Sequence, residues 1–157
     1  MTPETRPDQD ARGHRFCLVA ARFNQTYVER LLHGALETLK SRGAAEEDLE
    51  VLWVPGSFEL PLACRWAADS RRFDAVVAFG VVIRGETEHF RLVADAASQG
   101  ILRVALDTGV PVLNGVLAAY NAEQAAQRSG GALGNRGAEA ALAAVQMARL
   151  RSRLKPA

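Results

Sequence analysis

Mainly apolar runs alternate along the chain with segments in which apolar residues recur every three or four positions. Four such runs, typical of buried strands, lie at 15–21, 49–56, 73–83 and 110–118. Segments with helical spacing lie at 24–43, 58–70, 88–109, 121–130 and 135–155.

Strands and helices alternate with short connections, which favours parallel pairing through right-handed crossovers. We expect an α/β fold, a three-layer αβα sandwich around a four-stranded parallel, flavodoxin-like sheet. Residues 1–13 contain no apolar segment and are predicted to be a mobile tail, followed by a single domain over 14–157.

The last predicted helix is apolar on more than one side. Met147, Leu150 and Leu154 share one side, whereas Leu142 and Val145 point elsewhere. Such a helix needs more than one neighbour, and either its own domain or a partner subunit can supply the second.

Composition argues against several classes of function. Lys plus Arg number 19 and Asp plus Glu number 18, so charge gives no case for binding nucleic acid or an anionic membrane. No apolar run reaches the roughly 18 residues of a membrane-spanning helix. Cys17 and Cys64 lie in apolar surroundings without a Cys/His cluster, so we expect buried thiols in a reducing cytoplasm and no metal site.

Polar or aromatic residues follow each predicted strand, where parallel sheets bind ligands. Phe23, in "ARFN", can stack on a planar heterocycle or pack on the core as a corner aromatic. Ser57 and Glu59, in "VPGSFELP", can bind the hydroxyls of a polyol, or Ser57 can cap the next helix.

The densest group follows the third strand, in "GVVIRGETEHF". Gly85, Glu86 and Thr87 are expected at a helix start, where free N–H groups and the helix dipole favour phosphate. His89 can exchange protons near neutral pH, or it is an ordinary surface histidine. Further on, Arg128 provides half of a phosphate clamp or only a favourable charge at a helix C-terminus.

Taken together, "ARFN", "VPGSFELP", "GVVIRGETEHF", "PVLNGVL" and "NAEQAAQR…GNRG" resemble the lumazine synthase family in order and spacing over residues 15–153. The resemblance implies a transferase that condenses 5-amino-6-ribitylaminouracil with 3,4-dihydroxy-2-butanone 4-phosphate. The products would be 6,7-dimethyl-8-ribityllumazine, phosphate and water, at the penultimate step of riboflavin biosynthesis. No metal or organic cofactor would take part.

By matching position, the resemblance assigns residues to both substrates. Those expected at the uracil derivative are Phe23 and Asn114 around the pyrimidine, the main chain of Val81, Val82 and Ile83 at its polar edge, and Ser57, Phe58 and Glu59 at the ribityl chain. Those expected at the phosphate are Gly85, Glu86, Thr87 and Arg128, with His89 as proton donor.

Four positions depart from the family pattern or extend it. Glu86 stands where relatives also carry a small residue, so its carboxylate must turn away from the phosphate. Asn114 stands where some relatives carry Phe, which makes that wall more polar. Arg136 replaces a frequent Lys and keeps the charge with a different geometry. Glu139 would orient a protonated His89 across an interface, or it is a solvated helix residue.

The resemblance further implies a homo-oligomer. In the family the site lies between neighbours in a pentamer, so Asn114 and Arg128 would come from the adjacent subunit. The short "RSGGALGNRG" is similar to that of members forming sixty-subunit shells, and association with riboflavin synthase is expected. The N-terminal segment would add to a neighbour's sheet, so that "HRFCLVA" would be partly an intersubunit element.

Three other functions share some of these features. A non-catalytic flavin or lumazine carrier is disfavoured by the intact His89 and Arg128. A flavodoxin-like electron carrier is disfavoured because "RFNQTY" stands where a hydroxyl-rich phosphate loop is needed. A purely structural shell subunit is not separable by size from an enzyme that also forms shells.

Overall fold

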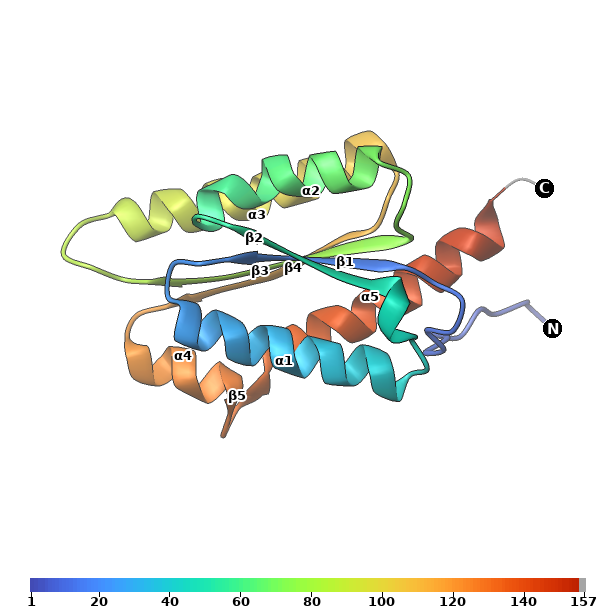
Figure 1. Ribbon diagram of the computed structural model, residues 1–157, viewed down its shortest axis with the longest axis horizontal. Coiled ribbons are helices and arrows are strands. Elements are labelled where there is room, and N and C mark those ends of the chain that lie inside the picture. Colours follow the sequence, from blue (N-terminus) through green and yellow to red (C-terminus); the bar gives the residue numbers. More distant parts are fainter. Residues whose placement is uncertain (156–157) are drawn as a thin grey trace.

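The computed structural model describes residues 1–155, and the last two residues of the predicted domain lie outside the described residues. Strands and helices alternate in the predicted order (Figure 1). The strands of the main sheet are β1 (Phe16–Ala21), β2 (Leu49–Val54), β3 (Ala75–Ile83) and β4 (Val112–Ala119). The helices are α1 (Gln25–Ser41), α2 (Leu60–Asp69), α3 (His89–Thr108), α4 (Ala122–Arg128) and α5 (Arg136–Leu154).

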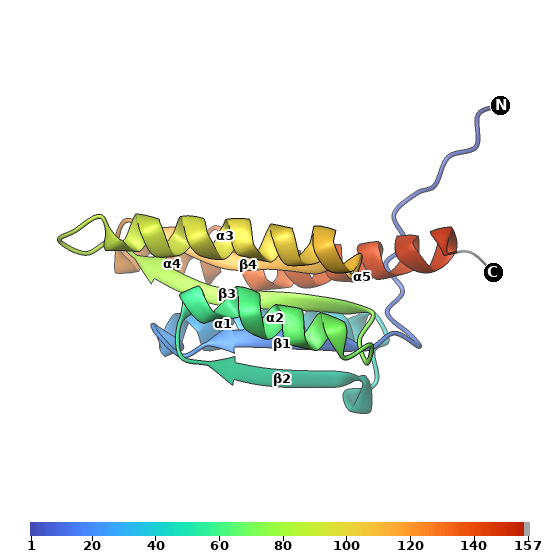
Figure 2. The ribbon, with the colours of Figure 1, turned by 90° about the horizontal axis from the view of Figure 1, so that it is seen from above.

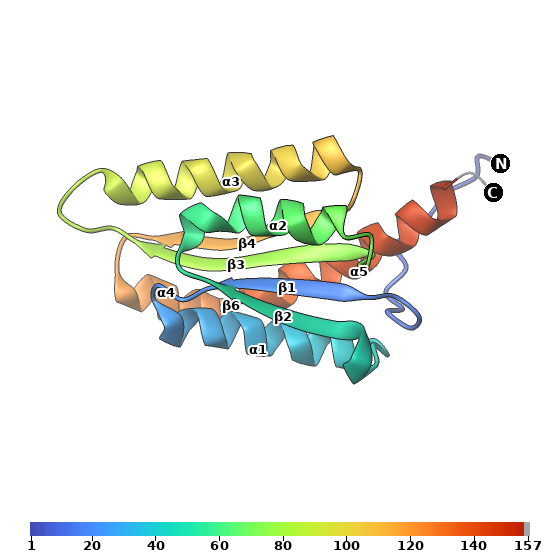
Figure 3. The same ribbon diagram turned by 45° about the horizontal axis from the view of Figure 1, so that its top comes forward.

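The four strands form one parallel sheet in the order β2-β1-β3-β4. Helices α2 and α3 cover one face, and α1, α4 and α5 lie on the other (Figure 1 and Figure 3). The predicted three-layer α/β sandwich is therefore confirmed. From β1 the chain adds β2 on one side and then β3 and β4 on the other side. Such a reversal of strand order opens a crevice at the carboxyl edge of the sheet.

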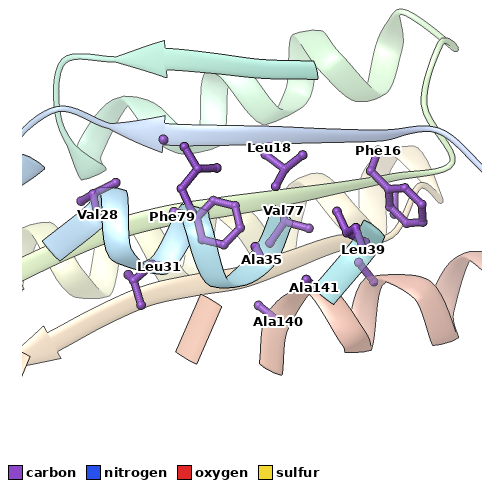
Figure 4. Packing of buried hydrophobic residues seen from close by; sticks show 14 of the residues in the cluster. Phe16, Leu18, Val28, Leu31, Ala35, Leu39, Val77, Phe79, Ala140 and Ala141 are labelled. Atoms are coloured by element: carbon purple, nitrogen blue, oxygen red, sulfur yellow. The ribbon is translucent and has the colours of Figure 1, made fainter. Parts of the chain in front are cut away.

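Side chains of β1 alternate between two hydrophobic layers. Phe16 and Leu18 pack with residues of α1 and α5, whereas Cys17 and Val19 pack with residues of α2 and α3. All four are fully buried. Figure 4 shows the first layer, where Phe79 of β3 lies beside Leu18. Burial on both faces explains why the strands read as unbroken apolar runs.

Helices α1 and α5 cross at close range, and the "GNRG" motif explains how. A Cβ atom on Gly137 would overlap the backbone of Leu31, so a larger residue does not fit at this point of α5. The Asn135 side chain accepts a hydrogen bond from Ala138 N–H at 3.0 Å and donates one to the Arg30 carbonyl at 3.0 Å. The motif therefore caps α5 and fixes its first turn against α1.

A short antiparallel pair joins α4 to α5, where the sequence predicted the end of one helix, a connection over 131–134 and the start of the next helix. It consists of β5 (Ser129–Gly131) and β6 (Gly134–Asn135). Gly130 and Gly134 have φ angles of 104° and 85°, which L side chains rarely adopt. The positive φ of Gly130 also explains why α4 ends at Arg128, before the end of the predicted helix at residue 130.

The N-terminal part of the chain packs on its own domain. Ala11 is fully buried and donates its N–H to the Arg42 carbonyl at 2.9 Å, and Arg149 of α5 donates to the Arg12 carbonyl at 2.8 Å. β1 pairs with both β2 and β3. The expectation that "HRFCLVA" adds to a neighbour's sheet is therefore wrong for residues 16–20, because both edges of this strand are already used. The boundary between tail and domain stays a prediction.

Helix α5 buries only one of its apolar sides. Val145 and the alanines around it are buried, whereas Met147, Leu150 and Leu154 are 45%, 36% and 73% exposed. Residues 1–155 therefore do not supply the second neighbour that the sequence pattern of α5 predicts. A partner subunit on this side stays a proposal.

Candidate active site

A cleft of about 430 Å³ opens at the carboxyl ends of β1, β2 and β3, a size typical of small-molecule sites. Three connections distant in sequence line it: Phe23, Asn24, residues 55–59 and 81–83, Gly85, Thr87, His89, Phe90 and Val93. Figure 2 shows the connection from β3 to α3 reaching beyond the edge of the sheet. The cleft lies where the reversal of strand order predicts one.

The ring of Phe23 is open to a ligand. It is 72% exposed, so the alternative of a corner aromatic packed on the core is wrong. The next residue, Asn24, has a left-handed backbone with φ of 59° and donates from Nδ2 to the Val81 carbonyl at 2.7 Å. Asn24 thus ties the end of β1 to the end of β3. The sequence analysis missed this role, although Asn is enriched at positive φ.

Ser57 lines the cleft yet is only 5% exposed. A Cβ atom on Gly80 of β3 would overlap Ser57 Oγ, so the glycine makes room for the hydroxyl. The turn at Ser57–Glu59 and helix α2 both begin without a side-chain cap, so the capping alternative for Ser57 is wrong. Phe58 and Glu59 are exposed beside it. A serine that is mostly buried but lines the cleft, next to an exposed carboxylate, suits a polyol.

A turn over residues 84–88 separates β3 from α3. Because α3 begins at His89, Gly85, Glu86 and Thr87 precede the helix instead of forming its first turn. Within the described part of the chain, the N–H groups of these three residues donate no hydrogen bond. They are therefore free to bind an anion, with the positive end of the α3 dipole next to them. Glu86 itself lies outside the lining of the cleft.

His89 is the first residue of α3 and lines the cleft. Its backbone N–H donates to Thr87 Oγ1 at 3.3 Å, which ties the helix start to the turn. The residue is exposed, and its imidazole has no hydrogen-bonding partner among residues 1–155. The imidazole is therefore accessible to a ligand in the cleft, and its role as proton donor stays a prediction.

The other predicted site residues lie outside this cleft. Asn114 of edge strand β4 is exposed and donates to Ser98 Oγ at 2.9 Å. Arg128 ends α4 and donates to the Gln124 carbonyl at 3.3 Å, which is the capping role of a helix C-terminus. Helix α4 lies on the opposite side of the sheet from α3 (Figure 1). Arg128 therefore lies away from the cleft of its own chain.

Arg136 and Glu139, in the first turn of α5, also lie outside the cleft lining. They form an ion pair with each other at 3.3 Å, and both are largely exposed. Glu139 therefore does not orient His89 within one chain. Both residues remain candidates only for a site shared with another subunit.

Cys17 and Cys64 are free, and burial raises the pKa of both thiols to about 12. Both stay protonated at neutral pH, so neither is an activated nucleophile. Within residues 1–155, no group of three or more His, Cys, Asp and Glu side chains is placed to hold a metal ion. In the same residues, no helix is both long and apolar enough to cross a membrane.

The fold and the cleft define a flavodoxin-like α/β protein with a cleft at the carboxyl edge of its sheet, whose lining suits a planar ligand and an anion. Comparison with known proteins narrows this class. Residues 13–152 match the family described as 6,7-dimethyl-8-ribityllumazine synthase. The chain belongs to this family, which confirms the resemblance of its motifs.

Two curated relatives support the assignment. A 6,7-dimethyl-8-ribityllumazine synthase of Halorhodospira halophila (strain DSM 244 / SL1) is 51% identical over 147 residues, covering 94% of this chain and 92% of that protein. A chloroplastic 6,7-dimethyl-8-ribityllumazine synthase of Arabidopsis thaliana is 48% identical over 138 residues. That alignment covers 88% of this chain but 61% of the longer plant protein.

Proposed function

We propose that the protein is a lumazine synthase that joins 5-amino-6-ribitylaminouracil to 3,4-dihydroxy-2-butanone 4-phosphate, at the penultimate step of riboflavin biosynthesis. The observation that carries the proposal is the composition of the cleft. It places an exposed aromatic ring, a mostly buried serine, a turn of free amides and an unpaired imidazole around one cavity. Family membership supports the same reaction.

Each part of the cleft suits one requirement of this reaction. Phe23 stacks on the pyrimidine, Ser57 and Glu59 bind the ribityl hydroxyls, and the turn at Gly85–Thr87 receives the phosphate. The substrate amine is already a nucleophile, so the protein does not need an activated Ser or Cys. Its main contribution is to hold two reactants in register, which can lower the barrier by several kcal/mol.

His89 supplies the remaining requirement, a proton. The amine adds to the ketone of the second substrate, and the resulting carbinolamine loses water when its hydroxyl is protonated. Departure of phosphate likewise needs its charge to be stabilised. A general acid that lines the cleft serves these steps, because it lies next to the free amides of residues 85–87, here called the anion turn.

Turnover with both purified substrates tests the proposal directly. We expect absorbance of 6,7-dimethyl-8-ribityllumazine to rise together with released phosphate in a one-to-one ratio, as the balanced reaction requires. Each substrate alone serves as the control and should give neither signal. Tight binding of a lumazine or flavin without phosphate release would instead identify a non-catalytic carrier.

We propose that the active protein is a pentamer in which the neighbouring subunit completes each cleft. Support comes from the separation of the predicted site residues, since Asn114 and Arg128 lie away from the cleft of their own chain. Exposed leucines on α3, Leu92, Leu102 and Leu106, offer an apolar surface for such contacts. We extend the proposal to a shell of sixty subunits, built from twelve pentamers, that associates with riboflavin synthase. Sedimentation velocity distinguishes a pentamer from a sixty-subunit shell.

We also propose a cytoplasmic location. Two free, buried thiols are typical of proteins in a reducing compartment, and this supports the proposal. One of the relatives is chloroplastic, so the location is specific to each protein. Fractionation of the native cell, followed by detection of the protein, checks it.

Mixing two impaired variants tests the shared cleft. His89→Ala and Arg128→Ala subunits, unfolded together and refolded in equal amounts, should recover about a quarter of wild-type activity at low phosphate substrate. A cleft is intact only when its own subunit carries His89 and the neighbouring subunit carries Arg128. Each condition holds for half of the subunits, so both hold for about a quarter of the clefts. Variants refolded separately and then mixed are the control. A co-refolded mixture no more active than the variants refolded separately would place both residues in clefts of single chains.

A further inference from the structure

Tyr120 occupies the connection between β4 and α4, and its backbone is fixed there. Its N–H donates to Gln124 Oε1 at 2.9 Å. Asn121, the N-cap of α4, accepts from Gln124 N–H at 2.8 Å through its side chain. The Tyr120 ring thus projects from an anchored corner, although the residue is 60% exposed.

The ring contacts residues on both sides of the anion turn. The Arg84 guanidinium lies over it, with Cζ 5.8 Å from the ring centroid. Phe90 packs against it in an edge-on arrangement, with ring centroids 6.3 Å apart and an interplanar angle of 62°. Arg84 directly precedes the turn at Gly85–Thr87, and Phe90 directly follows His89. One side chain on another strand connection therefore holds both ends of the turn.

Few other side-chain contacts restrain the turn from outside. The Arg84 N–H donates to the Ala119 carbonyl at 2.9 Å, a backbone contact that holds the residue before the turn at the end of β4. Glu88 forms an ion pair with Arg91 at 3.4 Å, but this pair lies within the same segment of chain. Tyr120 is absent from the lining of the cleft, whereas Phe90 is part of it. On a ligand in the cleft of its own chain, Tyr120 can therefore act only through Arg84 and Phe90.

We propose that Tyr120 is a positioning residue for the anion turn and for His89. Amide N–H groups bind an anion well only when they already point at it, because ordering a loose turn consumes binding free energy. The Tyr120 ring supplies this order through a cation–π contact on one side and an aromatic contact on the other. The inference rests on the proposed function for its kinetic consequence, but not for its structural one.

Hydrogen exchange of the hydrogen-bonded amides of Arg84, His89 and Arg91, on the two sides of the turn, tests the structural part without any substrate. Tyr120→Ser should raise the exchange rates of these amides by about tenfold, the effect of losing two contacts of this kind. Tyr120→Phe keeps the ring and should exchange as the wild type does. Arg84→Gln should give part of the increase. Arg30→Gln removes a similar guanidinium from over Tyr27 (5.5 Å) and should leave the exchange of these amides unchanged.

Steady-state kinetics test the functional part. Tyr120→Ser should raise KM for dihydroxybutanone phosphate by about tenfold, while KM for ribitylaminouracil stays within about twofold because the Phe23 end of the cleft is not touched. Tyr120→Phe should match the wild type in both. A merely structural role would change both KM values together, or only thermal stability.

The outcomes separate this inference from the proposed function. Wild-type exchange rates and kinetics in a folded Tyr120→Ser protein would overturn the positioning role. Faster exchange with equal losses for both substrates would overturn it as well. A wild-type protein that turns over neither substrate would overturn the proposed function, while the exchange data would still decide whether Tyr120 orders the turn.

Discussion

Replacing His89 by alanine is expected to lower kcat by about 10²–10⁴-fold without abolishing turnover. The variant loses the general acid for carbinolamine dehydration and phosphate departure. It keeps the stacking ring, the ribityl-binding residues and the free amides that hold the two reactants together. Since that alignment contributes independently to the rate, a measurable reaction should remain. Single-turnover absorbance of the lumazine product measures the chemical step.

His33→Ala is the matched control for this prediction. His33 is also exposed, but it lies on α1, where it pairs with Glu37 at 3.1 Å, and it does not line the cleft. Its removal should leave kcat unchanged. Loss of all detectable product in a folded His89→Ala protein, or no loss at all, would contradict the division between proton supply and alignment.

Replacing Arg128 by alanine is expected to raise KM for the phosphate substrate by about 10- to 100-fold, because a charge-assisted hydrogen bond contributes about 1.5–3 kcal/mol. KM for ribitylaminouracil should change little, since this substrate carries no phosphate. The KM of Arg128→Lys for the phosphate substrate should lie between those of the wild type and Arg128→Ala, because Lys keeps the charge but not the bidentate geometry. Initial rates over a matrix of both substrate concentrations separate the two KM values.

Arg103→Ala controls for the loss of one positive charge. Arg103 lies on α3 with its side chain 83% exposed, and its partner is Asp107 at 3.3 Å. We expect both KM values of this variant to equal those of the wild type. An unchanged KM for the phosphate substrate in Arg128→Ala would leave Arg128 only its contact with the Gln124 carbonyl, as a helix-terminal charge.

Most of the fold could be predicted because its signals are local and repeated. Strand β3 is apolar throughout because both of its faces are covered, and the helices carry apolar residues at helical spacing. The hairpin after α4 was missed since its two short strands depend on the positive φ of Gly130 and Gly134, which composition alone does not reveal. The intersubunit role expected for "HRFCLVA" was wrong for residues 16–20, because β2 and β3 of the same chain occupy both edges of β1. This pairing depends on segments distant in sequence.

The site was predictable to a smaller extent. Each motif named residues of the right chemistry, and those following β1, β2 and β3 do meet in one cleft. Two residues were missed, Asn24 and Tyr120, because each acts on a segment distant in sequence. Asn24 bonds to the Val81 carbonyl, and the Tyr120 ring contacts Arg84 and Phe90. No local sequence pattern predicts a contact between such distant segments.

The sequence by itself determined the order of elements, the parallel sheet and the family, since hydrophobic periodicity and motif spacing are properties of neighbouring residues. Only the tertiary structure decided which polar residues share a cavity, because folding brings distant connections to one edge while the sheet itself keeps others apart. It therefore placed His89 in the cleft and Arg128 outside it on the other layer. It also showed that Ser57 is buried beside Gly80 instead of capping a helix.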